Sequence, residues 1–278
     1  MERERLTITL RSDLVDLLDS RIDGYRLRNR SHAIEYYLSR ELGGKLSRAV
    51  ILCGGNGVQL RPFTYELPKA LIPVKGRPLL EHTIDMLRDQ GIRDIVLTVD
   101  YLGDKIEQHF GDGAKFGVKI QYVQLKKPAG TAGSLSAVEN VIGTQPFLLL
   151  YGDVLASIDY QELIEFHANH KKLVTMAVTS HADPSAAGAV SLRGSKVVSF
   201  TEKPKTAGHS RLISAGIFVM EPAIFATLVA TKPASLEEMV FPQLVDKGEI
   251  VGFVFDAPWY DITTPESYER VLKEWKGQ

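Results

Sequence analysis

Cysteine is almost absent from this chain of 278 residues, which contains only Cys53. A lone cysteine excludes an internal disulfide, so the sequence gives no sign of an oxidising compartment. No apolar run reaches the roughly 18 residues of a membrane-spanning helix, and the charged amino terminus does not resemble a signal peptide. Neither charge is in excess, because 33 Lys and Arg stand against 34 Asp and Glu. We therefore expect a cytoplasmic protein without membrane contact, and the net charge indicates no particular partner.

The clearest local pattern is a hydrophobic run over residues 49–52 that breaks into glycines at Gly54, Gly55 and Gly57. The run shows no alternation, which is typical of a strand covered on both faces. Glycines let the backbone turn sharply and bring its N–H groups close to an anion, with Lys69 as a candidate positive charge for a phosphate. The G-x-x-x-x-G-K-[ST] and G-x-G-x-x-G patterns are both missing here, so a simple tight turn is the alternative.

Strand and helix patterns then alternate along the chain. They predict helices over residues 79–90, 102–110 and 134–140, and strands over residues 95–99, 118–123 and 146–151. This order indicates βαβ units and a largely parallel sheet, in which ligands bind beyond the carboxyl ends of the strands.

Two features follow the strand over residues 146–151. Asp153 is well placed to hold Mg²⁺ against phosphate oxygens, with a turn or helix-cap role as the alternative. Asp159 is expected to cap a helix over residues 160–170. His167 and His170 on that helix have no matching Cys or His pair, so we expect surface residues and no zinc site.

The stretch from residue 54 to 74 fits Gly-Gly-x-Gly-x-x-Leu-x-Pro-x-Thr-x-x-x-Pro-Lys-x-Leu-x-Pro-Val, which resembles the signature of the sugar-1-phosphate nucleotidyltransferases (NDP-sugar pyrophosphorylases). The resemblance extends to about residue 272. It implies an α/β fold: a mixed, mostly parallel, Rossmann-like (GT-A-like) αβα nucleotidyltransferase domain over residues 49–278. It also implies a Mg²⁺-dependent reaction in which an NTP and a sugar-1-phosphate give an NDP-sugar and pyrophosphate.

Further motifs carry the family's site residues onto this chain: Gly130-Thr131-Ala-Gly, Gly-Asp153, Glu202-Lys203-Pro and Trp-Tyr-Asp261. By this resemblance the catalytic positions are Lys69, Asp153, Asp261 and Gln59, and Asp153 and Asp261 are the metal ligands. The nucleotide-binding positions are Leu52, Gly54, Gly55, Gly57, Gly130 and Thr131, and the sugar-phosphate-binding positions are Glu202 and Lys203.

Four positions depart from the family pattern, one of them Ser214 in place of an Asn. Gln59 stands where the family has an Arg that contacts pyrophosphate, and loss of one such contact typically costs about 3 kcal/mol of transition-state stabilisation. Leu125 stands where a Gln reads the base, so either Gln124 takes that role or base selection differs. Thr263 replaces a favoured Gly near the metal. The motifs lean slightly toward the mannose-1-phosphate guanylyltransferase-like branch, without identifying the sugar or the base.

The first 45 residues form a separate unit in the sequence. Residues 5–10 alternate as in a half-buried strand, and helical spacing follows over residues 14–22 and 31–42. Strand, helix, helix over residues 3–42 resembles the ribbon-helix-helix family, which implies a dimer whose paired strands enter the DNA major groove. By that resemblance Arg5, Thr7 and Thr9 read base edges, and Asn29 and Ser31 hold a backbone phosphate.

Two readings of the whole chain therefore stay open. The first is an enzyme whose amino-terminal unit pairs subunits into a homodimer or larger assembly. The second is a regulator that binds double-stranded DNA and senses a sugar nucleotide without efficient turnover. Residues 1–46 hold nine Lys or Arg against eight Asp or Glu. That balance is weak for a DNA binder, so pure dimerisation remains an alternative.

Overall fold

The structure is a computed structural model that describes residues 7–24, 27–42, 46–183, 185, 187–205, 210–228 and 234–277. The chain divides into two compact units, Met1–Lys45 and Leu46–Gln278. Each unit is described separately below.

The amino-terminal unit contains two helices, α1 (Ser12–Asp19) and α2 (Arg30–Leu42). Asn29 begins α2, because its Oδ1 accepts a hydrogen bond from the His32 backbone N–H at 2.9 Å. Arg30 forms an ion pair with Asp19 at 2.5 Å, which joins the two helices. No residue of α1 is buried. The two helices thus agree with the sequence prediction, but α1 contributes no core.

The predicted strand over residues 5–10 is not formed by the part that the structure describes. Residues 7–10 have no strand partner and all four are exposed, while Arg5 and Leu6 lie outside the described residues. A single chain does not form this strand, so a strand that pairs between two chains stays a prediction. The physical reason is that a strand needs a neighbouring strand to satisfy its backbone, and one copy of this unit supplies none.

The large unit is built on a nine-stranded mixed sheet in the order β5-β4-β1-β6-β11-β8-β12-β10-β9. Pairings among β5, β4, β1 and β6 are parallel, and so is β8 with β12, whereas β11 and β10 run antiparallel to their neighbours. The strands are β1 (Arg48–Leu52), β4 (Asp94–Val99), β5 (Lys119–Gln124), β6 (Phe147–Tyr151), β8 (Val174–Ser180), β9 (Gly188–Arg193), β10 (Lys196–Glu202), β11 (Leu212–Met220) and β12 (Ile250–Val254). Two small sheets pair β2 (Pro73–Val74) with β3 (Arg77–Pro78) and β7 (Val154–Ala156) with β13 (Trp259–Asp261).

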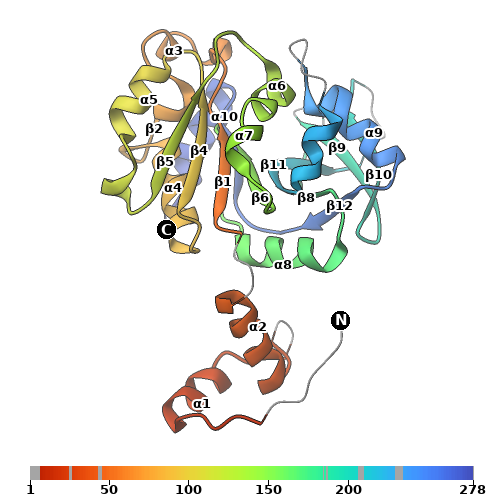
Figure 1. Cartoon of the computed structure of the whole chain (residues 1–278). Helices are drawn as coiled ribbons and strands as arrows, with labels where there is room; N and C mark the ends of the chain where they lie inside the picture. Colours follow the sequence, from red (N-terminus) through yellow and green to blue (C-terminus); the bar gives the residue numbers. More distant parts are fainter. Residues whose placement is uncertain are drawn as a thin grey trace. The chain divides into compact units, whose positions relative to one another are not determined.

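Helices cover both faces of the large sheet (Figure 1). One layer holds α4 (Leu79–Asp89), α5 (Gly103–Phe110), α8 (Tyr160–His170) and α10 (Pro265–Glu274). The other holds α6 (Gly130–Ser136), α7 (Glu139–Ile142), the π-helical turn η6 (Leu236–Val240) and α9 (Phe241–Asp246). The short segments are α3 (Phe63–Glu66), η1 (Val58–Leu60), η2 (Lys69–Leu71), η3 (Ala114–Phe116) and η5 (Pro222–Thr227). The predicted mixed αβα fold is confirmed.

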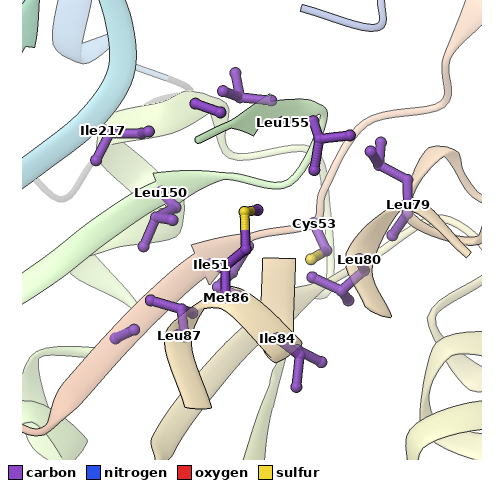
Figure 2. Close-up of a cluster of buried hydrophobic side chains, with 14 of the residues drawn as sticks. Ile51, Cys53, Leu79, Leu80, Ile84, Met86, Leu87, Leu150, Leu155 and Ile217 are labelled. Carbon is purple, nitrogen blue, oxygen red and sulfur yellow. The ribbon is translucent and has the colours of Figure 1, made fainter. Parts of the chain in front are cut away.

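Figure 2 shows part of the core on the α4 face of the sheet. Leu80, Ile84 and Leu87 of α4 share one buried cluster with Ile51 of β1, and all four side chains are fully buried. Cys53 lies in the same cluster and is 8% exposed, and burial raises the pKa of its thiol above the ordinary value. The cysteine therefore packs as a small apolar residue. No helix among the described residues combines the length and the apolar character that a bilayer crossing requires.

Strand register places several loops at one edge of the sheet. Leu52 at the end of β1 lies opposite Thr98 on β4 and Tyr151 on β6. Since these three strands are parallel, the segments that follow them emerge together beyond their carboxyl ends. Those segments contain the glycine loop, Asp100 and Asp153.

Candidate active site

The glycine loop, which contains Gly54, Gly55 and Gly57, follows β1 and packs against the aliphatic part of the Lys69 side chain. The Cys53 backbone N–H donates to the Thr98 carbonyl at 3.0 Å, which holds the start of the loop against β4. Gly57 has a φ of +56°, and a Cβ there would lie 2.7 Å from Thr64 Cγ2 and 2.9 Å from Lys69 Cγ. The Thr64 hydroxyl donates to the Gly57 carbonyl at 2.7 Å. Only glycine permits both this backbone conformation and this close approach.

Lys69 lies near two carboxylates beyond the carboxyl ends of the parallel strands. Its ammonium forms an ion pair with Asp153, which directly follows β6. Asp261 lies opposite Val154 in the β13–β7 pairing, so the chain places it next to Asp153. Burial, and then the charge of Asp153, raise the pKa of Asp261 to about 6. Burial alone would lower the pKa of Lys69, but the charge and hydrogen bond of Asp153 raise it above the ordinary value.

These three groups fit a site for a divalent cation. Two carboxylates against one ammonium leave a net negative charge, and after burial the charge of Asp153 is the second cause of the raised pKa of Asp261. The Thr263 hydroxyl donates to Asp261 and partly offsets this rise in pKa. No group of three or more metal-ligating side chains occurs among the described residues. A pair of carboxylates completed by substrate phosphates and water is the usual protein environment of Mg²⁺.

The first cavity, called the loop cavity, lies between the glycine loop and the start of α6. Its wall is mostly backbone and small side chains, from Leu52, Gly54, Gly55, Asp100, Pro128, Ala129, Gly130, Thr131, Ser134, Tyr151 and Asp153.

Gly130 forms the first turn of α6, which begins four residues earlier than the predicted helix over residues 134–140. Its φ is +71°, and a Cβ there would lie 2.5 Å from the Ala234 carbonyl oxygen. Two backbone hydrogen bonds hold this approach, from Ala132 N–H to Ala234 O at 2.9 Å and from Ala234 N–H to Ala129 O at 3.0 Å. The segment before η6 therefore holds in place the start of α6, where Ala129 and Gly130 line the loop cavity.

The second cavity, called the carboxylate cavity, shares Tyr151 and Asp153 with the first. It is lined mainly by charged and polar side chains, among them Lys69, Glu202, Lys203, Ser214, Glu237, Asp261 and Thr263. Burial, and then the charge of Glu237, raise the pKa of Glu202 above its ordinary value. The Lys203 backbone has a φ of +42°, in the left-handed region that non-glycine residues rarely adopt.

Glu237 connects the two cavities and was not found from the sequence. Its carboxylate accepts hydrogen bonds from Thr131 Oγ1 at 2.7 Å, from Ser235 Oγ at 2.6 Å and from the Tyr151 hydroxyl. Burial, and then the charge of Glu237, raise the pKa of Tyr151 well above its ordinary value, so Tyr151 stays a donor. A single carboxylate thus ties the α6 start, β6 and η6 together.

Gln59 lies elsewhere, in a third cavity that we call the outer cavity. It shares that cavity with Lys203, Asp261 and Arg270, while Lys69 and Asp153 do not line it. The side chain of Arg270 stacks on the Tyr260 ring, with Cζ 5.4 Å from the centroid. The outer and carboxylate cavities meet at Lys203 and Asp261.

Comparison with known proteins decides the family. A sequence profile described as nucleotidyl transferase matches residues 48–277, nearly the whole large unit. The chain belongs to the nucleotidyl transferase family. The resemblance inferred from the glycine-loop signature is therefore confirmed for the large unit.

Named relatives of this nucleotidyl transferase include two guanylyltransferases. The mannose-1-phosphate guanylyltransferase catalytic subunit beta of Drosophila melanogaster is 32% identical over 229 residues, covering 81% of this chain and 62% of that protein. A mannose-1-phosphate guanylyltransferase of Mycobacterium tuberculosis is 34% identical over 225 residues, covering 80% of this chain and 62% of that protein. The chain therefore spans about three fifths of the length of these relatives.

Solved structures show the same fold. A putative glucose-1-phosphate thymidylyltransferase from Bacillus anthracis, in complex with sucrose, matches with a TM-score of 0.75 and 26% identity, over 81% of this chain and 93% of that one. The HddC protein of Yersinia pseudotuberculosis matches with a TM-score of 0.72 and 25% identity, over 83% of this chain and all of that one.

The structure brings most of the predicted site residues of this nucleotidyl transferase together. The loop cavity holds Leu52, Gly54, Gly55, Gly130 and Thr131, and the carboxylate cavity holds Lys69, Glu202, Lys203 and Asp261, with Asp153 in both. Gly57 packs beneath the loop against the Lys69 stem, and Gln59 faces the outer cavity. In the amino-terminal unit Thr7, Thr9, Asn29 and Ser31 are exposed.

One smaller expectation is wrong. His167 was expected on the surface, but it is 3% exposed on α8. Its Nδ1 lies 2.8 Å from the Thr175 hydroxyl on β8, and its Nε2 lies 3.3 Å from Glu221. Burial lowers the pKa of His167 below the ordinary 6.5. His167 is therefore a core residue on the face of α8 that packs on the sheet, and the spacing of α8 alone does not reveal which face that is.

Proposed function

We propose that this nucleotidyl transferase joins an NTP and a sugar-1-phosphate to give an NDP-sugar and pyrophosphate. The observation that carries this proposal is the meeting of the two cavities at Asp153 and Tyr151, beside Lys69 and Asp261. The loop cavity suits a nucleotide, because its glycine loop offers backbone N–H groups and most of the side chains that line it are small. The carboxylate cavity suits a sugar phosphate, because it offers carboxylates for hydroxyl groups and lysines for phosphate.

The chemistry needs alignment more than a general base. A phosphate monoester has a second pKa of about 6, so a sugar-1-phosphate is largely a dianion at neutral pH. One of its oxygens attacks the α-phosphorus of the NTP, the bond to the β-phosphate oxygen breaks, and pyrophosphate leaves. In this proposal Lys69 and Lys203 offset the phosphate charge, and the pair of cavities holds the reactants in line. Mg²⁺, held by Asp153 and Asp261, would neutralise further phosphate charge when bound.

The names of the relatives favour GTP and mannose-1-phosphate as the first pair of substrates to test. The experiment is pyrophosphate release, with and without Mg²⁺, over a panel of NTPs and hexose-1-phosphates. We expect one pair to turn over and the rate to fall to background when Mg²⁺ is chelated. Absence of turnover with every pair, in a chain that still binds nucleotide, would contradict the enzyme proposal and favour the sugar-nucleotide sensor.

Gln59 gives a second experiment on the same proposal. A permanent cation in the outer cavity would lie beside Lys203 and Asp261, where the leaving pyrophosphate would carry its charge. We expect Gln59→Arg to raise kcat by roughly tenfold to a hundredfold if pyrophosphate occupies that cavity. An Arg variant that folds normally and is no faster would place the leaving group elsewhere.

We further propose that the amino-terminal unit joins two copies of the chain. Ile8, Leu14 and Leu17 are 52%, 42% and 56% exposed, and α1 buries nothing. A unit of about 45 residues rarely supplies its own core, and antiparallel pairing of residues 5–10 from two copies would satisfy their backbone and cover this apolar face. We expect the full chain to scatter light as a dimer and Leu17→Glu to give monomers. A monomeric wild type would contradict the proposal.

DNA binding by the same unit stays a prediction with its own test. Thr7 and Thr9 are exposed, as a base-reading strand requires, while Arg5 lies outside the described residues. We expect salt-sensitive binding to a palindromic duplex, weakened by Arg5→Ala with the dimer intact. If the wild-type dimer shows no salt-sensitive binding, the unit only pairs subunits.

A further inference from the structure

Asp100 lies at the carboxyl end of β4 and contacts the glycine loop. Its Oδ1 accepts a hydrogen bond from the Gly55 backbone N–H at 3.0 Å and another from the Tyr101 backbone N–H. The side chain lines the loop cavity and also a neighbouring cavity, the adjoining cavity, which extends toward Gln124 and Leu125. Asp100 thus stands where the space for a nucleotide continues past the glycine loop.

The second carboxylate oxygen of Asp100 has no hydrogen-bond partner among the described residues. It lies over the glycine loop, since a Cβ on Gly54 would be 3.2 Å from Oδ2. Oδ1 is already used by two N–H donors, whereas Oδ2 keeps its acceptor positions for a ligand. The two donors also set the orientation of the side chain.

The residue at the position from which the family reads the base cannot do so here. Leu125 is apolar and 8% exposed, and its backbone N–H is used by the Val99 carbonyl at 2.8 Å. Gln124 lines the adjoining cavity, but its Oε1 is turned toward the start of α5, within 3.2 Å of where a Cβ on Gly103 would lie. Among the described residues, Asp100 is the one polar side chain that lines both cavities, and its Oδ2 is a free acceptor.

We propose that Asp100 sets the base specificity of the nucleotide site and selects guanine. This inference rests on the proposed function, in which the loop cavity holds the NTP. A carboxylate oxygen only accepts hydrogen bonds. Guanine places two adjacent donors, N1–H and the 2-amino group, on one edge. Adenine and cytosine place a donor next to an acceptor, and uracil places one N–H between two carbonyls, so each of them sets a lone pair against the carboxylate.

Asp100→Asn tests this inference with little change of shape. The Gly55 and Tyr101 N–H groups require an oxygen at the Oδ1 position, so the Asn amide is oriented with its NH₂ in place of Oδ2. That NH₂ opposes both guanine donors, whereas it can donate to the 2-carbonyl that xanthine has in place of the 2-amino group. We expect kcat/KM for GTP to fall roughly tenfold to a hundredfold, and use of XTP to rise by a similar factor. In the wild type, kcat/KM should be lower for ITP than for GTP, because the ITP base lacks the 2-amino group.

Two variants are matched controls. Asp104→Asn removes the same charge four residues away at an exposed position of α5 and should leave the GTP-to-XTP ratio unchanged. Gln124→Ala removes another polar side chain of the adjoining cavity, the one next to Leu125, and should leave the preference for guanine in place. If Gln124→Ala abolishes that preference and Asp100→Asn does not, the assignment to Asp100 is overturned.

Calorimetric binding of GTP, ITP, XTP, ATP and UTP, without sugar phosphate, separates this inference from the proposed reaction. Preferential GTP binding that moves to XTP in Asp100→Asn supports the inference even if no pair turns over. A loss that is equal for all nucleotides would assign Asp100 to the ribose or to loop shape and overturn the inference. A wild type that binds no nucleotide overturns the inference and the proposed function together.

Discussion

The loop cavity and the carboxylate cavity touch each other but are built from different material. Around the glycine loop, the wall is backbone and small side chains, shaped by Gly57 and Gly130 at positions where a Cβ would clash. Beyond Asp153 the wall becomes charged, with Glu202, Lys203 and Asp261 projecting from separate elements. The first cavity is therefore preset by the fold, whereas the chemistry of the second can change through side chains alone. Substitutions should affect the two sides in different ways.

The largest effect is expected at the charged junction. Asp261→Asn removes one of the two carboxylates that would hold Mg²⁺, and we expect kcat to fall a hundredfold or more. The fold should not suffer, because a pKa raised to about 6 means that ionising Asp261 costs more free energy in the folded chain than in the unfolded chain. The measurements are steady-state rates and a thermal melt. Activity within a few fold of wild type would remove Asp261 from the site.

Gly130→Ala should damage the loop cavity. The positive φ of Gly130 and a distance of 2.5 Å to the Ala234 carbonyl oxygen both oppose a Cβ. We therefore expect the free energy of unfolding to fall by about 2 kcal/mol, and KM to rise more for the NTP than for the sugar phosphate. Gly91→Ala is the control, because Gly91 also has a positive φ but its added Cβ meets nothing within 4 Å. Equal losses in both variants would show that the contact with Ala234 is unimportant.

Glu237→Ala tests the connection between the two cavities. It leaves the hydroxyls of Thr131, Ser235 and Tyr151 without their acceptor, so we expect about 2 kcal/mol less stability and weaker binding of both substrates. Glu238→Ala, at the exposed neighbouring position, is the matched control. Binding is measured by calorimetry for each substrate separately. An effect on one substrate only would confine Glu237 to a single cavity.

Glu202→Gln should affect only the carboxylate cavity. The variant keeps the shape of the group and removes a charged acceptor, so KM for the sugar phosphate should rise roughly tenfold while KM for the NTP stays the same. Initial rates with each substrate varied in turn measure this. A parallel rise in both constants would mean that the cavities are not separable in function.

The smallest effect lies outside both cavities, at His167. Its pKa is lowered by burial, so the unfolded chain binds the proton more readily, and stability present above pH 6.5 should be lost as the pH falls below that value. In His167→Gln this part of the pH dependence should disappear. Melting temperatures from pH 8 to pH 5 measure it. Parallel curves for the two proteins would show that His167 does not carry the effect.

Much of the fold followed from local sequence. The apolar runs of β1 and β6 and the cap of α8 by Asp159 are all visible as short patterns, and the structure forms each of them. Such signals act within a few residues. The strand expected over residues 5–10 is different, because its partner would come from a second chain, so it stays a prediction.

The candidate site likewise contains residues that local motifs predicted and residues that they missed. Lys69, Asp153, Glu202 and Asp261 were found through motifs, but Glu237 was not, since its partner Thr131 lies 106 residues away along the chain. Asp100 also escaped notice, because a single acid after a strand has no distinctive spacing. His167 was misplaced because helical spacing alone does not say which face meets the sheet.

By itself the sequence determined the strand and helix order, the glycine loop and the motifs that identify the family, because each depends on neighbours in the chain. Tertiary structure alone decided that Glu237 bridges two cavities, that Gln59 faces a third, and that Asp100 keeps one carboxylate oxygen free beside the glycine loop. Those facts depend on which distant strands lie side by side and on where each donor finds its acceptor. They emerge only when the sheet is assembled.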